Sequence, residues 1–243
     1  MESAIDAAQP AAAAAMIDDV LQRVAELSKE CEHGPALVLL DRTVQADRND
    51  ARLHAARGWA LENLGPARLR EARAAYETAV ALDAGELWAQ AGLANVLGQL
   101  GLTACCAPIY RDVALQAAAR APREPEFIEL LGWCHYRLGR LVEAADTFAR
   151  ALAIDTTWVS VRFDLGLVLL LRGDADGAIE HYRGALHALA GRGPRQRPGP
   201  LKVALDDLDD ALAQQPSLCT TPAAIGIRAR LEQAANAHAP SHV

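Results

Sequence analysis

The sequence is poor in the features that β-rich and membrane-spanning proteins need. Aromatic residues make up only 5% of the 243 residues, while alanine, the strongest helix former, is abundant. No apolar run reaches the ~18 residues that a transmembrane helix requires. The N-terminus carries Glu2 and Asp6 instead of the basic region of a signal peptide. These features predict an all-α, cytoplasmic protein without membrane insertion.

The cysteines do not form a pattern typical of disulfide or zinc frameworks. They stand at positions 31, 105, 106, 134 and 219, an odd number without a Cys-x-x-Cys pair. Cys105 and Cys106 could form a redox or metal-binding thiol pair. We expect instead two small apolar residues on the buried side of a helix, and the same burial for Cys134.

Catalytic and cofactor-binding motifs are also lacking. The sequence contains no phosphate loop, His-Glu-x-x-His motif, nucleophile elbow or dinucleotide fingerprint. His181 and His187 lie six residues apart, which is not the spacing of one helix face. We therefore predict a protein that is not an enzyme and has no cofactor and no metal. An enzyme that uses a helical frame would need a convergent polar cluster, which the sequence does not show.

The balance of charge argues against a nucleic-acid partner. The net charge is −7 and the pI is near 5.5, whereas nucleic-acid-binding surfaces are basic. Lysine occurs only at Lys29 and Lys202 beside abundant arginine, which we interpret as codon bias of a bacterial source. We expect the arginines between 192 and 197 to be solvated.

Two consecutive windows of the chain, 125–158 and 159–192, repeat one another at an offset of 34 residues. A fixed offset over several positions of matching size indicates a repeat architecture. The matching pairs are Leu131 and Leu165, Gly132 and Gly166, Gly139 and Gly173, Ala144 and Ala178, Phe148 and Tyr182, Ala151 and Ala185, and Leu152 and Leu186.

The repeated positions predict a helix, a tight turn and a second helix. Apolar residues recur at helical spacing on both sides of Gly139, and glycine commonly follows a helix C-terminus. Gly132 and Ala144 remove side-chain bulk where the two helices should cross. Phe148 in the first window, and Tyr182 in the second, would fill the remaining gap.

These residues resemble the tetratricopeptide repeat family. Both windows carry its small residue, turn glycine, alanine and aromatic positions, but depart from it at two others. Ile128 and Arg162 replace the first large aromatic residue, and Thr156 and Ala190 replace the closing proline. The resemblance implies a right-handed solenoid of about five helix-turn-helix hairpins with a C-terminal helical cap.

We extend this pattern to a division of the whole chain. The third repeat is irregular, with either a longer turn or an extended first helix. Near the C-terminus, Leu201, Leu205, Leu208 and Leu212 predict an amphipathic helix, whose Asp206, Asp207, Asp209 and Asp210 we place on the solvated face. The predicted segments are a low-complexity tail (1–15), a solenoid (16–192) with repeats at about 17–50, 51–86, 87–124, 125–158 and 159–192, a linker (193–200) and capping helices (201–238).

The resemblance also implies a binding groove, because the first helix of each such repeat lines the concave face. Tryptophan and tyrosine there would be natural anchors for a partner segment. The alternative is that these rings pack against a neighbouring repeat or against a C-terminal helix that folds back. The groove positions carried over are Trp59, Glu62, Asn63, Leu93, Glu129, Trp133, Tyr136, Arg137, Phe163 and Leu167.

The function expected from these features is that of a scaffold or adaptor. Its partner would be a protein or peptide segment, or a helix, bound in the groove. One alternative is a self-assembling structural module, for example a homodimer formed through the degenerate N-terminal repeat. Another is a secretion or assembly chaperone for a specific client.

Overall fold

The protein is described here by a computed structural model. It describes residues 2–237, with side chains from residue 14 onward. The chain forms two compact units, residues 1–109 and 110–243, and the boundary lies within the predicted irregular repeat 87–124. The two units are described separately below.

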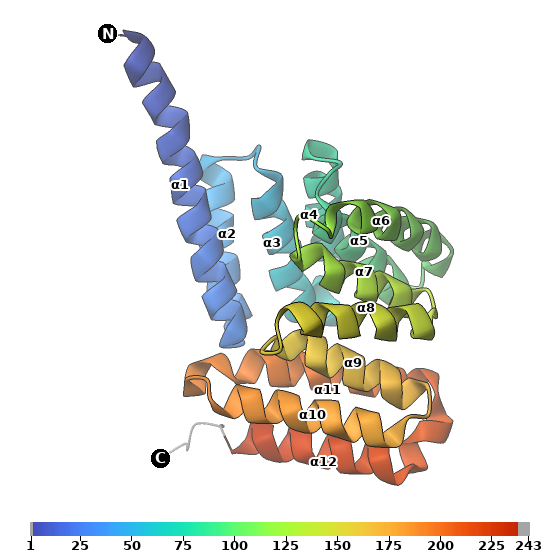
Figure 1. Cartoon of the computed structure of the whole chain (residues 1–243). Coiled ribbons are helices and arrows are strands. Elements are labelled where there is room, and N and C mark those ends of the chain that lie inside the picture. Colours follow the sequence, from blue (N-terminus) through green and yellow to red (C-terminus); the bar gives the residue numbers. More distant parts are fainter. Residues whose placement is uncertain (1, 238–243) are drawn as a thin grey trace. The chain divides into compact units, whose positions relative to one another are not determined.

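Helices account for nearly all of the described chain (Figure 1). The α-helices are α1 (Glu2–Lys29), α2 (His33–Ala46), α3 (Ala51–Asn63), α4 (Leu69–Leu82), α5 (Leu87–Gln99), α6 (Cys106–Arg120), α7 (Glu126–Arg137), α8 (Leu141–Ile154), α9 (Val159–Leu171), α10 (Ala175–Ala190), α11 (Pro198–Gln214) and α12 (Pro222–Asn236). Short 3-10 helices are η1 (Pro66–Arg68), η2 (Thr103–Cys105), η3 (Pro194–Gln196) and η4 (Pro216–Thr220).

The predicted all-α fold class is confirmed. Between residues 2 and 237 there is no strand, and successive helices pack as hairpins, as in the α3–α4, α7–α8 and α9–α10 pairs. In this part of the chain no helix is both long and apolar enough to cross a membrane.

Close contacts between glycine and an aromatic ring hold the hairpins together, as the repeat pattern predicts. A methyl group added at Gly132 would lie 2.6 Å from a ring carbon of Phe148, and one at Gly166 would lie 2.7 Å from a ring carbon of Tyr182. These distances are too short for any side chain. The first helix therefore needs glycine at this position so that the aromatic ring of the second helix can lie against its backbone.

The turns between paired helices also follow the prediction. Gly65, Gly101, Gly139 and Gly173 all have positive φ angles between 72° and 101°, a region that glycine adopts without steric cost. In the irregular repeat, α5 ends at Gln99 and the additional residues form η2. The turn is therefore longer, and the first helix is not extended.

Unit 1 begins with the long helix α1, which includes residues 2–15. The sequence assigned these residues to a low-complexity tail, but an alanine run has high helix propensity even without a core-facing pattern. From Ile17 onward the helix contributes buried side chains, among them Val24 and Leu27, to the core that α2 and α3 share. The predicted first repeat thus has a much longer first helix than the others.

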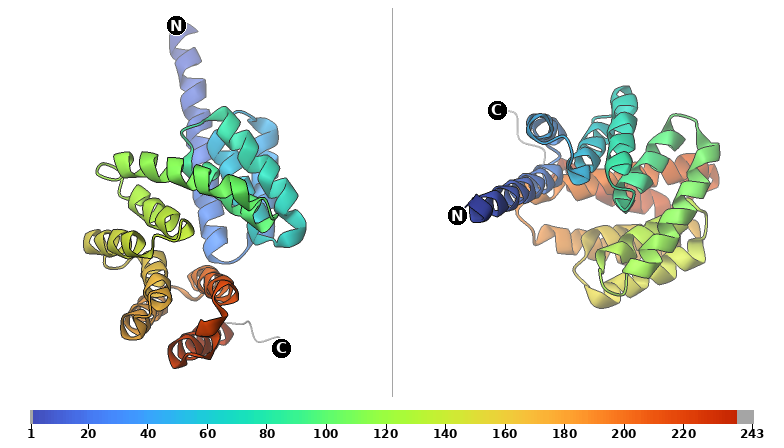
Figure 2. Two further views of the ribbon diagram at one scale, coloured as in Figure 1. Left: turned by 90° about the vertical axis from the view of Figure 1, so that its right-hand side faces the viewer. Right: turned by 90° about the horizontal axis from the view of Figure 1, so that it is seen from above.

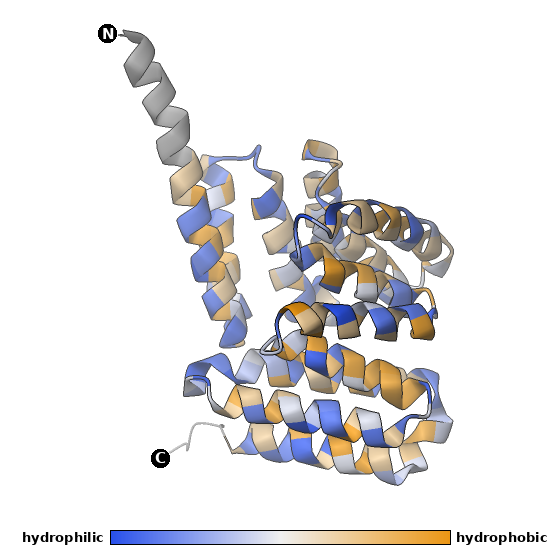
Figure 3. Ribbon diagram, viewed as in Figure 1, coloured by the Kyte–Doolittle hydropathy of each residue, from blue (hydrophilic) through white to orange (hydrophobic). Residues whose placement is uncertain are grey.

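Unit 2 ends with two helices that pack on its last hairpin. α11 contacts α9, and α12 contacts both α10 and α11 (Figure 2). α9 is rich in hydrophobic residues (Figure 3), and its buried side chains share a core with those of α11 and α12. α11 already begins at Pro198, inside the segment predicted as a linker. As predicted, Thr221 caps α12, since its hydroxyl accepts a hydrogen bond from the Ala224 amide at 3.3 Å.

The glycine–aromatic contact gives a direct stability prediction. We expect Gly132→Ala to lower the free energy of unfolding by about 1–3 kcal/mol, because the added methyl group forces Phe148 out of its place. Gly34→Ala is the control, since a side chain there meets no atom within 4 Å. Urea unfolding of both variants checks this, and equal stabilities would contradict the proposed role of the contact.

Candidate partner-binding surfaces

Trp59 of α3 is the most prominent predicted groove residue of unit 1. It is half-buried, and its ring packs edge-to-face against His33 of α2, with ring centroids 5.1 Å apart. Leu93 of α5 and Trp59 both pack against the core of this unit without being fully buried. Asn63 lies one turn further along α3 and donates a hydrogen bond to the Trp59 carbonyl at 2.9 Å. One part of the Trp59 ring is thus held in place while another part reaches solvent.

Glu62 has a structural role that sequence reasoning did not predict. Its Oε2 accepts a hydrogen bond from the Tyr76 hydroxyl at 3.0 Å. Its Oε1 accepts two more, from the side-chain amides of Asn95 at 2.6 Å and Gln99 at 2.8 Å. Glu62 therefore joins α3, α4 and α5, and its carboxylate is already used within the protein.

In unit 2 the corresponding tryptophan, Trp133 of α7, is fixed by a small aromatic and cationic cluster. Its ring packs edge-to-face against Tyr110 of α6, with ring centroids 5.5 Å apart. The Arg137 guanidinium lies 5.4 Å from the Trp133 ring centroid and 5.7 Å from that of Tyr110. Such cation–π contacts orient both partners. Trp133 nevertheless remains half-exposed, as do Tyr136 and Arg137.

Phe163 and Leu167 of α9 are buried, and this corrects their assignment to an open groove. Their exposed fractions are 4% and 3%, and they share a core with Leu208 of α11. The C-terminal helix α11 folds onto α9 and covers these side chains. For these two positions the alternative of internal packing is therefore the correct one.

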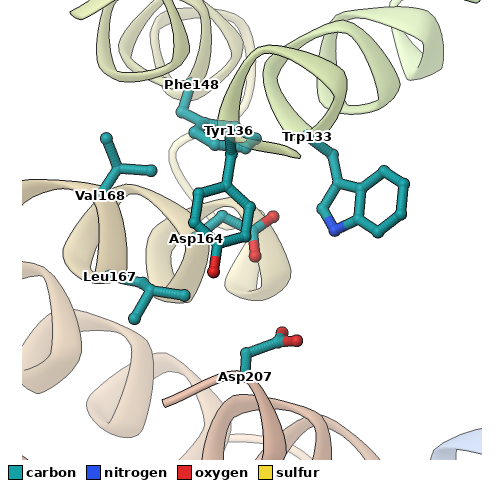
Figure 4. Close-up of a pocket in the computed structure, with 7 residues that line it drawn as sticks. All are labelled: Trp133, Tyr136, Phe148, Asp164, Leu167, Val168 and Asp207. Atoms are coloured by element: carbon teal, nitrogen blue, oxygen red, sulfur yellow. The ribbon is translucent and has the colours of Figure 1, made fainter. Parts of the chain in front are cut away.

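A narrow depression in unit 2 brings predicted and unpredicted residues together (Figure 4). Trp133 and Tyr136 come from α7, Asp164 from α9 and Asp207 from α11. Figure 4 shows the Asp164 carboxylate beside the Tyr136 ring, with the Asp207 carboxylate facing it from α11. Asp207 is thus not on the solvated face of α11, where the sequence placed it.

The comparisons with known proteins agree with this architecture. The tetratricopeptide repeat model matches residues 111–157 and 159–194, which lie within unit 2. Residues 111–194 of this chain therefore contain tetratricopeptide repeats. No curated protein matches its sequence.

Several solved structures are similar to this chain at low sequence identity. A chain of the APC/C hetero-tetramer Cut9–Hcn1 aligns with 16% identity and a TM-score of 0.52, over 90% of this chain and 46% of that one. The pilF protein of Pseudomonas aeruginosa aligns with 16% identity and a TM-score of 0.48, over 88% and 96% of the two chains. MamA of Desulfovibrio magneticus RS-1 aligns with 20% identity and a TM-score of 0.43, over 72% and 97%. At these identities the similarity concerns the fold alone.

The thiols of the protein differ from one another in exposure. Cys134 is fully buried, as predicted, and burial raises the pKa of its thiol to about 12. Cys105 is exposed, which contradicts the predicted burial, because it belongs to the turn segment η2 and not to the buried side of α6. Cys106 is half-buried, and its Sγ lies 3.1 Å from the Ala94 carbonyl oxygen. Among the described residues no group of three or more His, Cys, Asp or Glu side chains could hold a metal ion.

The electrostatics of the depression are dominated by carboxylates. Burial raises the pKa of Asp164 well above its usual value, and the negative charges of Glu129 and Asp207 raise it further. Burial also raises the pKa of Glu129, although a hydrogen bond from Ser160, 2.6 Å long, opposes this. The pKa of Tyr136 is raised to about 12 by burial and, next, by the charge of Asp207. At neutral pH, ionising Asp164 therefore costs folding free energy.

The sequence pattern did not predict Asp164 and Asp207 as site residues, because neither lies at a groove position of the repeat. Asp164 lies one position after Phe163, outside the groove positions carried over from the family, and Asp207 lies in a helix that the repeat pattern does not cover. The one available signal was an acidic residue in the largely apolar helix 159–171, which also contains Arg162.

We expect Asp164→Asn to stabilise the protein at pH 7. A carboxyl whose pKa is raised by folding contributes stability below its unfolded-state pKa, near 4, and loses that contribution as pH rises through the folded-state value. Replacing this titratable carboxyl by an amide should therefore raise the free energy of unfolding and the Tm at pH 7. It should also make the decline of stability between pH 5 and pH 8 shallower, and Glu129 should leave a residual decline.

Urea unfolding across this pH range measures the effect. Asp146→Asn, on the exposed surface of α8, is the matched control and should change stability little. A loss of stability in Asp164→Asn at pH 7 would show that the carboxylate stabilises the fold, and would contradict this description.

Proposed function

We propose that the protein is a non-catalytic scaffold or adaptor that binds a segment of another protein on the first helices of its repeats. Tetratricopeptide repeat proteins generally mediate protein–protein interactions. The observation that carries the proposal is the shared position of Trp59 and Trp133. Each stands directly after the glycine of its repeat that contacts an aromatic ring, and each is fixed on one side and half-exposed.

Groove residues that are buried or already hydrogen-bonded within the protein are left out of the proposed surfaces. In unit 1 the surface consists of Trp59, Asn63 and Leu93, since Glu62 is engaged in hydrogen bonds. In unit 2 it consists of Trp133, Tyr136 and Arg137, with Glu129 at its edge. Half-exposed aromatic side chains that are held rigidly suit partner recognition, because little conformational entropy is lost when the partner binds.

The other expected roles stay predictions. The acidic net charge favours the absence of nucleic-acid binding. A cytoplasmic location and a bacterial source are further predictions from the sequence. Homodimerisation would be recognised by sedimentation velocity at two protein concentrations. A secretion or assembly chaperone would be a special case of the segment binding proposed here, distinguished by release of its client.

The tryptophans can be tested by affinity capture from a lysate of the source organism followed by mass spectrometry. We expect Trp59→Ala and Trp133→Ala each to reduce the recovery of specific partners about tenfold or more, as loss of an aromatic anchor typically does. The double variant should lose these partners entirely.

Trp88→Ala is the matched control, because Trp88 lies on the first helix of a repeat but outside the proposed positions and is 43% exposed. It should retain the partners, and circular dichroism should show that all variants are folded. Retention of every partner by the double variant would refute the proposed surfaces.

A further inference from the structure

Two side-chain amides of α5 are held against α3 in unit 1. Glu62 of α3 accepts hydrogen bonds through the same Oε1 atom from Asn95 Nδ2 at 2.6 Å and from Gln99 Nε2 at 2.8 Å. Glu62 follows Trp59 by three residues and therefore lies on the same face of α3. The two amides are thus placed beside the proposed partner-binding surface of unit 1.

The bonding partner of each amide decides which of its two ends remains for a ligand. A side-chain amide has a donating NH2 group and an accepting oxygen, whereas a carboxylate only accepts. Asn95 and Gln99 can therefore turn only their NH2 groups toward Glu62. Asn63 is oriented in the same way, since its Nδ2 donates to the Trp59 carbonyl at 2.9 Å, and a carbonyl also only accepts. In all three amides the oxygen is the end left for another partner.

These three oxygens are not used by the protein itself. Within residues 14–237, no hydrogen bond is accepted by the side-chain oxygen of Asn63, Asn95 or Gln99. Solvent reaches the oxygens of Asn63 and Asn95, and Gln99 is an exposed residue. The unit 1 surface therefore combines the half-buried Trp59 ring with hydrogen-bond acceptors whose orientation is fixed before a partner binds.

Fixed acceptors beside an aromatic ring suit an extended chain better than a helix. In an extended chain, alternate residues direct their N–H groups to the same side, about 6.6 Å apart. Asn95 and Gln99 stand one helical turn apart, a separation of roughly 6 Å. A helical partner offers few donors, because the N–H groups beyond its first turn are already bonded within the helix.

We propose that the side-chain oxygens of Asn63, Asn95 and Gln99 accept hydrogen bonds from the backbone N–H groups of an extended segment of the bound protein. Apolar side chains of this segment pack against the Trp59 ring. Glu62 is a positioning residue, which orients two of the acceptors without contacting the segment. This inference rests on the proposed function and selects an extended segment, and not a helix, as the partner of unit 1.

Synthetic peptides test the hydrogen bonds from the ligand side. Random decapeptides displayed on phage are selected on the full-length protein, and sequences that bind the parent protein but not Trp59→Ala are synthesised. Each backbone nitrogen is then methylated in turn, which removes one donor. We expect methylation of alternate nitrogens in the bound segment to weaken binding about three- to tenfold each, as the loss of one hydrogen bond does.

Variants of the protein connect this effect to named oxygens. Asn95→Ala and Gln99→Ala should each weaken the unmethylated peptide about three- to tenfold. Neither should weaken the peptide further when the matching nitrogen is methylated, because the same hydrogen bond is then already lost. Glu62→Gln should show the same pattern, since the amides of Asn95 and Gln99 are then free to turn. Gln45→Ala, at an exposed position of α2, is the matched control and should leave binding unchanged.

Methylated peptides leave the protein unaltered, so their effect does not depend on whether a variant folds, and urea unfolding checks each variant. Additive losses from methylation and from Asn95→Ala or Gln99→Ala would overturn the proposal, because a purely structural effect of these variants would weaken both peptides equally. Tolerance of methylation at every nitrogen would also overturn it.

The same measurements separate failure of this inference from failure of the proposed function. Peptides that depend on Trp59 but tolerate methylation at every nitrogen would leave the proposed function standing and refute the extended segment. If no selected peptide depends on Trp59, the unit 1 surface and this inference both fail. The capture experiment with Trp133→Ala then decides whether the proposed function holds for unit 2.

Discussion

The close approach of a glycine in one helix to an aromatic ring in the next is the constraint on which this structure depends. Gly58 faces Tyr76, Gly132 faces Phe148 and Gly166 faces Tyr182, each with room for a hydrogen atom and none for a methyl group. The contact fixes the distance and the crossing of the paired helices. Because it recurs along the chain, it makes the hairpins similar enough to pack on one another in sequence.

This constraint also determines which side chains are available for recognition. In α3 and α7 the residue after the contact glycine is a tryptophan, so Trp59 and Trp133 project from helices whose orientation the contact has already set. Edge-to-face contacts with His33 and Tyr110 then fix the two rings. The proposed sites are thus built on rigid elements, which lowers the entropy lost on binding.

The local parts of the fold could be predicted from the sequence, because each depends on residues close together in the chain. The offset of 34 residues, the turn glycines with positive φ and the crossing glycines all follow from short-range spacing. The packing of α11 on α9 could not be predicted in this way. It is a long-range contact between an irregular C-terminal helix and a repeat, and no periodic pattern specifies it.

The same long-range contact accounts for the errors in the predicted site. It buries Phe163 and Leu167, which the repeat pattern alone places in an open groove, and it brings Asp207 to face Asp164. The helical structure of residues 2–15 and the exposure of Cys105 were missed for local reasons, a compositional bias and a turn of unusual length. In unit 2 the residues that remain from the predicted groove lie on α7.

The most direct test of the central claim is the accessibility of these tryptophans to a neutral quencher such as acrylamide. Variants that retain only Trp59 or only Trp133 would be compared with one that retains only Trp88, which is 43% exposed. If both surfaces are open for a partner, quenching of Trp59 and Trp133 should approach that of Trp88. Quenching as weak as that of a fully buried indole would mean that the chain itself covers both rings, and would contradict the account.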